Sequence, residues 1–133
     1  MIADQIAELA AVRAAEHGAP PSQHPLPNGG VLIRVPDVPI GPGWNRPSAN
    51  ILFVAPPGYP AAQPDCFWVE PAGLRLEGGG TPQASNDSNP IPGDIEPGRK
   101  ATWFSWHLQS WDPNAGKLHH YFNTIMRRLQ PAR

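Results

Sequence analysis

Two segments, one near each end of the chain, place apolar residues at the spacing of an amphipathic helix. In the first, which covers residues 2–16, the apolar stripe runs through Ile2, Ile6, Leu9 and then Val12 or Arg13. In the second, the stripe is formed by Leu118, Phe122, Ile125 and Leu129. Gly18 is expected to cap the first helix in a left-handed conformation, and Pro131 is expected to end the second.

Between these helices, short runs of β-branched and apolar residues alternate with turns rich in proline and glycine. The runs predict strands at residues 31–35, 50–55 and 65–70. Pro36 and Pro39 are expected to confine the first strand to a sheet edge, whereas the nearly all-apolar second strand is expected to be central. The order of helix, strands and helix indicates an α+β domain built on an antiparallel meander.

Composition and charge limit the domain organisation and the binding partners that the chain can be expected to have. The 133 residues include 19 prolines and 13 glycines, which fits a single domain, residues 1–133, with an N-terminal helix in 1–18 and a long loop at 77–100. Ten basic and eleven acidic side chains give no reason to expect binding to nucleic acid or to an anionic membrane. No segment has the apolar pattern of a membrane span or a signal peptide, so the sequence predicts a cytoplasmic protein.

The centre of the chain carries the motif APPGYPAAQPDCFWVEP, in which Tyr59-Pro60 and Pro64 precede the third predicted strand. Later, Trp111-Asp112-Pro113 precedes the C-terminal helix. In this order the features resemble the UBC-like fold of E2 ubiquitin-conjugating enzymes, where a Trp-x-Pro opens a helix after the active-site loop. More closely, PPGYP, DCFW, the Gly-rich stretch and SWH followed by Trp111 resemble the prokaryotic E2 family E over residues 25–130.

The resemblance implies a role in a bacterial ubiquitin-like conjugation pathway, with a ubiquitin-like protein and an E1-like (ThiF-like) activating enzyme as partners. The N-terminal helix, Ile2 to Arg13, would face the E1-like enzyme. An E2 accepts its cargo on a cysteine thiolate, but the residue eight positions before Trp111, where the E2 pattern keeps that cysteine, is Trp103. The accompanying His-Pro-Asn is also missing, and Asn89-Pro90 is the nearest segment. The leading interpretation is an E2-like protein that binds its partners without the standard cysteine.

Ser105 and His107 suggest a second interpretation, an active acyl-transfer enzyme. Residues two apart on a strand share a face, so His107 as a base would activate Ser105 to hold an acyl group as an oxyester. The sequence identifies no carboxylate to orient His107, so a structural role is favoured for the pair. Cys66, the single cysteine, is a weaker candidate because it falls inside a predicted strand, where free cysteines are usually buried and inert.

A third interpretation is an interaction module with no part in conjugation. Trp103, Trp106 and Trp111 fit either of two roles, since clustered tryptophans fill cores and also form partner-binding surfaces. No third His, Cys or acidic ligand accompanies the histidines at a diagnostic spacing, so neither a metal nor a cofactor is predicted.

Overall fold

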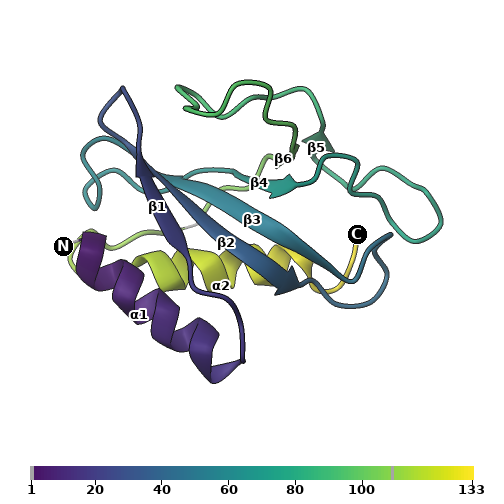
Figure 1. Ribbon diagram of the computed structural model, residues 1–133, viewed down its shortest axis with the longest axis horizontal. Coiled ribbons are helices and arrows are strands. Elements are labelled where there is room, and N and C mark those ends of the chain that lie inside the picture. The colour runs from purple at the N-terminus through teal and green to yellow at the C-terminus, as the bar shows by residue number, and fades with distance from the viewer. Residues whose placement is uncertain (1, 109) are drawn as a thin grey trace.

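An antiparallel sheet with both helices on one of its faces forms the fold (Figure 1). The computed structural model describes residues 2–108 and 110–133. Within these residues the helices are α1 (Ile2–Ala15) and α2 (Leu118–Leu129), and the strands are β1 (Ser22–Pro25), β2 (Val31–Pro39), β3 (Ser48–Ala55), β4 (Phe67–Glu70), β5 (Ser85–Asn86) and β6 (Thr102–Phe104). The strand order is β1-β2-β3-β4-β6-β5. The predicted α+β class and meander are confirmed.

The two predicted apolar stripes form the contact between the helices and the sheet. Leu9 of α1 is buried, as are all four stripe residues of α2, and they pack with Phe53 of β3 in the main core. The opposite face of the sheet carries a second, smaller cluster, in which Leu52 and Trp68 pack with Ile91. Because β3 is covered on both faces, its sequence is almost continuously apolar, as the central strand of the sheet.

Two local predictions, one about β2 and one about the end of α1, are wrong. β2 is not an edge strand, because β1 lies on its far side. The sheet accommodates Pro36 at a register shift between Val35 and Val38, where a missing N–H costs no regular ladder bond. After α1, the left-handed residue is His17, with φ of 58°, rather than Gly18. Gly18 instead lies against the Arg13 guanidinium, where a Cβ would be only 2.3 Å from the nearest nitrogen.

The long segment 77–100 is tied to the outer face of the sheet. It contains β5, which pairs with β6, and its Ile91 is buried in the smaller cluster. The Trp68 indole N–H donates to the Asn89 carbonyl over 2.8 Å. Arg99 forms ion pairs with Glu70 of β4 and with Asp94 in the same segment. The segment is therefore an ordered cover for the outer face of the sheet, and its contacts with Trp68 and Glu70 of β4 hold it there.

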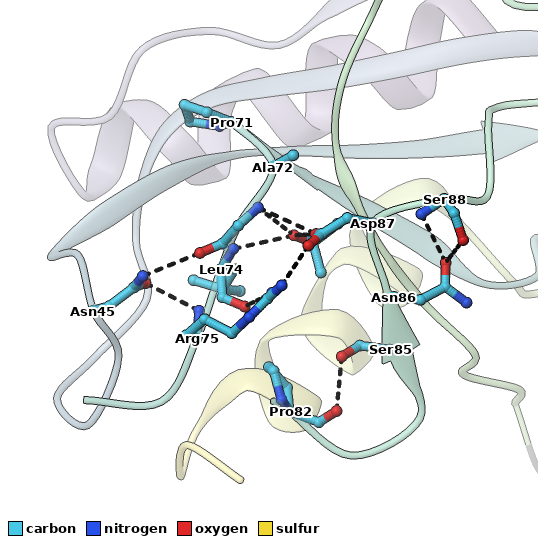
Figure 2. Close-up of polar contacts among 12 residues, drawn as sticks. Asn45, Pro71, Ala72, Leu74, Arg75, Pro82, Ser85, Asn86, Asp87 and Ser88 are labelled. Carbon is cyan, nitrogen blue, oxygen red and sulfur yellow. Dashed lines mark hydrogen bonds and ion pairs between the residues drawn. The ribbon is translucent and has the colours of Figure 1, made fainter. Parts of the chain in front are cut away.

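A polar network around Asp87 fixes the end of β5 (Figure 2). The Asp87 carboxylate accepts hydrogen bonds from Arg75, from the Thr102 hydroxyl and from the Gly73 N–H, at 2.5, 2.5 and 3.1 Å. Partial burial works against ionisation, but these donors outweigh it and hold the pKa of Asp87 at about 2. Asn45 extends the network by accepting from the Arg75 N–H and donating to the Gly73 carbonyl.

Candidate functional site

The candidate site lies where β4 begins and β6 ends. These strands are antiparallel and place Phe67 opposite Phe104, so the residues just before β4 lie beside those just after β6. The Cys66 N–H donates to the Trp106 carbonyl over 2.9 Å, which continues the pairing beyond the strands. Two segments far apart in the sequence, DCFW and SWH, therefore meet at one end of the sheet.

At this junction Asp65, His107 and Ser105 form a hydrogen-bonded chain. His107 Nδ1 is hydrogen-bonded to the Asp65 carboxylate, which lies 42 residues away in sequence, and His107 Nε2 lies 3.3 Å from Ser105 Oγ. The Asp65 and His107 side chains are 54% and 61% exposed, so solvent and substrates reach these two groups directly. A carboxylate that orients an imidazole, which in turn contacts a hydroxyl, is the arrangement that activates a serine nucleophile.

Asp65 is the residue that sequence reasoning missed. The available signal was the DCFW motif, which places an acid immediately before a strand that pairs with the strand ending next to Ser105. The prediction that Ser105 and His107 share one face of a strand is wrong, because both residues follow β6 instead of lying in it. Their side chains nevertheless meet, and the Ser105 N–H is anchored to the Ala84 carbonyl at 2.8 Å.

Cys66 lies beside the hydrogen-bonded residues Asp65, His107 and Ser105. It precedes β4, although it was expected to lie inside that strand. It is half-buried and has a left-handed φ of 60°. Its backbone is held on both sides, because its carbonyl also accepts a hydrogen bond of 2.7 Å from the hydroxyl of the buried Tyr121. Burial raises the pKa of the Cys66 thiol; the Asp65 carboxylate acts in the same direction, and a hydrogen bond from the Trp106 backbone opposes both.

The two motifs that suggested the fold contact each other next to the site. The Trp111 indole N–H donates to the Pro60 carbonyl over 2.7 Å, and its ring packs on Tyr59 with centroids 5.9 Å apart. The Trp-x-Pro motif does not open a helix directly, because α2 begins only at Leu118. Trp111 and Trp106 are partly buried against the main core. These tryptophans therefore support the loop that carries the candidate site.

The family model of prokaryotic E2 family E matches residues 23–132. The chain belongs to this family. Comparisons with curated proteins and with solved structures find no match. No helix in residues 2–108 and 110–133 is long and apolar enough to cross a membrane.

In this family E protein, the position where the sequence pattern expects a cysteine lies inside the sheet. Trp103 is in β6, opposite Trp68 of β4 and Asn86 of β5, and it packs against the smaller apolar cluster. It supplies no nucleophile. Ser105, two residues further on, bears the hydroxyl that contacts His107.

An open hollow of about 650 Å³ adjoins the site, between the segment after β6 and α2. Its lining includes Ser105 and His107 on one side and Thr124 and Arg127 of α2 on the other. The end of a polypeptide substrate that enters this hollow would lie beside the Ser105 hydroxyl. Arg127 gives the far wall a positive charge, which favours a substrate with a polar or anionic end.

Proposed function

We propose that this protein is an E2-like acyl carrier of a bacterial ubiquitin-like conjugation pathway, and that it holds the ubiquitin-like protein on Ser105 as an oxyester. The observation that supports this most strongly is the chain of contacts from Asp65 through His107 to Ser105. It supplies the orienting carboxylate that a serine and histidine alone lack. The family membership supports the same role, because E2 proteins carry acyl groups between an E1-like enzyme and a target.

The proposed acyl donor is a thioester between the carboxyl end of the ubiquitin-like protein and a cysteine of the E1-like enzyme. Ser105 Oγ attacks the carbonyl carbon of this thioester while its proton passes to His107 Nε2. The C–S bond then breaks, and His107 returns the proton to the leaving thiolate. The products are an oxyester on Ser105 and a free thiol on the E1-like enzyme. Asp65 keeps the imidazole in the productive tautomer and stabilises its protonated form.

Cys66 is the second candidate nucleophile because its sulfur lies within 4.8 Å of ligand atoms of both Asp65 and His107. Two features weigh against it. It is half-buried, and burial raises the pKa of its thiol, which lowers the thiolate fraction available for attack. A thioester on Cys66 is therefore ranked below an oxyester on Ser105.

A non-catalytic E2-like protein is the other alternative, and the exposure of the site favours it. Asp65 and His107 are more than half open to water, which weakens hydrogen bonds that a closed active site would strengthen. In either case α1 is the proposed contact for the E1-like enzyme. Its outward face would make this contact, since Leu9 and Arg13 on the inner face are buried.

The test is a charging reaction with the E1-like enzyme, the ubiquitin-like protein and ATP. The proposal predicts an adduct that resists thiols, is cleaved by hydroxylamine and is lost in Ser105→Ala. Ser110→Ala is the matched control, because Ser110 is an exposed serine that lines the same hollow. A thiol-sensitive adduct lost in Cys66→Ser would assign the chemistry to Cys66. Binding without an adduct would leave a non-catalytic role, and the lack of any binding would favour an interaction module outside conjugation.

A further inference from the structure

The junction of β4 and β6 also brings together a set of metal ligands. Asp65, Cys66 and His107 each offer one ligand atom, and these atoms all lie within 4.8 Å of one another. A carboxylate oxygen, a thiolate sulfur and an imidazole nitrogen are ligands that zinc takes in proteins. We propose that these three residues bind a zinc-class divalent cation, with a fourth coordination position open to solvent.

The ligands are held in place before any ion arrives. Cys66 is fixed through both of its backbone groups, by Trp106 on one side and by the fully buried Tyr121 on the other. His107 is oriented by its hydrogen bond to Asp65. A preorganised set of ligands binds a metal more tightly, because less conformational entropy is lost on binding. The exposure of Asp65 and His107 gives an ion a direct path to the site.

Sequence spacing gave no indication of this site. Zinc ligands are usually recognised as pairs only a few residues apart, and here Asp65 and His107 are separated by 42 positions. Only Asp65 and Cys66 are neighbours in the chain, and an Asp-Cys pair has no diagnostic value alone. The pairing of β4 with β6 creates the site.

A metal on His107 would switch off the acyl carrier, and this part of the inference rests on the proposed function. One ring nitrogen of His107 contacts Ser105 and the other contacts Asp65. If the ion takes the first nitrogen, His107 cannot accept the Ser105 proton. If it takes the second, the hydrogen bond to Asp65 is lost. The Cys66 thiol releases its proton to solvent when its sulfur binds the ion, so the metal-bound form is a distinct, inactive state.

Titration of the whole chain with Co²⁺ alone tests the metal site without any acyl chemistry. We expect one ion per chain, with a thiolate-to-cobalt charge-transfer band and the visible bands of a four-coordinate ion. Cys66→Ser should abolish the charge-transfer band, and His107→Gln should weaken affinity by at least tenfold. His120→Gln is the control, because His120 is an exposed histidine of α2 outside the ligand set. The proposal is wrong if all four proteins give the same spectrum and affinity.

A second experiment separates the metal site from the acyl carrier. Ser105→Ala should lose the adduct but still give the cobalt spectrum, because Ser105 is not one of the three ligands. Zn²⁺ should suppress adduct formation by the wild-type protein at least tenfold. Cys66→Ser, compared with its own rate without zinc, should be much less sensitive. A cobalt spectrum without any adduct would leave the metal site intact and remove the proposed function. An adduct that zinc does not affect would overturn the regulatory role.

Discussion

Two aspartates, one on each side of β6, show how differently the same side chain is used in this molecule. Asp65 precedes β4 and Asp87 follows β5, and β6 lies between these two strands. The Asp87 carboxylate accepts hydrogen bonds from three donors, and its side chain is 30% exposed. Asp65 is 54% exposed and is hydrogen-bonded to a histidine that itself contacts a serine hydroxyl.

The two carboxylates differ in how much of their hydrogen-bonding capacity remains free. Asp87 uses its lone pairs on donors that belong to the surrounding loops, so it fixes their geometry and has little capacity for a ligand. Asp65 has free lone pairs and faces solvent, so it can hold a histidine during proton transfer or bind a cation. The first network holds the fold together, and the second is suited to chemistry.

The largest expected effect comes from Asp65→Asn. We expect the rate of Ser105-dependent adduct formation to fall by about 10²–10⁴-fold, because an amide does not hold His107 in the productive tautomer. The free energy of unfolding should change by no more than about 0.5 kcal/mol, as at other exposed positions. Single-turnover charging assays and urea denaturation measure the two quantities. An unchanged charging rate would remove Asp65 from the mechanism.

Asp87→Asn should do the opposite. It replaces a carboxylate that accepts charge-assisted hydrogen bonds, so we expect a loss of about 1–3 kcal/mol in the free energy of unfolding. The charging rate of the folded protein should stay within about threefold of wild type, since the Asp87 carboxylate is hydrogen-bonded to Gly73, Arg75 and Thr102 and to none of the site residues. Urea denaturation and the same charging assay are the measurements. A charging defect as large as that of Asp65→Asn would erase the distinction between the two networks.

The sequence predicted the parts of this fold that follow from local periodicity. The stripe that ends at Leu129 and the continuous apolar run of β3 are buried as expected, because hydrophobic spacing reports directly on which face is covered. Strand β6 (Thr102–Phe104) was not among the three predicted strands, and strands β1 and β5 were not predicted either. Their sequences, SQHP and SN, carry no strand signal, and they exist because the neighbouring strands offer them backbone partners.

The candidate site was predictable only in part, for a similar reason. Ser105 and His107 were paired from their spacing of two residues, although the strand on which that argument relied ends at Phe104. Asp65 joins them through the register of β4 against β6, and a register is a property of the folded sheet. The left-handed conformation of Cys66 is equally invisible, because tertiary contacts to Trp106 and Tyr121 hold it.

The ionised Asp87 network should also make the stability of the fold depend on pH. The pKa of Asp87 is about 2 in the folded protein, below its ordinary value of 3.8. A carboxyl group with a lowered pKa stabilises the fold fully above its unfolded pKa, and this contribution disappears as the pH falls through the folded pKa. The difference in unfolding free energy between wild type and Asp87→Asn should therefore be constant from pH 7 to 5 and should shrink between pH 4 and 2. A difference that does not vary with pH would contradict the ionised network.

The smallest expected effect is that of Tyr121→Phe, which tests whether the exposed site depends on the core for its geometry. The change removes the hydroxyl that donates to the Cys66 carbonyl, so we expect a loss of about 0.5–1.5 kcal/mol in stability. The charging rate and the cobalt affinity should each fall by a few-fold, because Cys66 and the adjacent Asp65 are held less firmly. Tyr59→Phe is the matched control, since its buried hydroxyl donates to Gln5 of α1 and not to the site. If both variants lower stability alike but only Tyr121→Phe weakens charging and cobalt binding, the buried tyrosine positions the site. Equal effects of the two variants on charging and cobalt binding would mean that Tyr121 contributes only to stability.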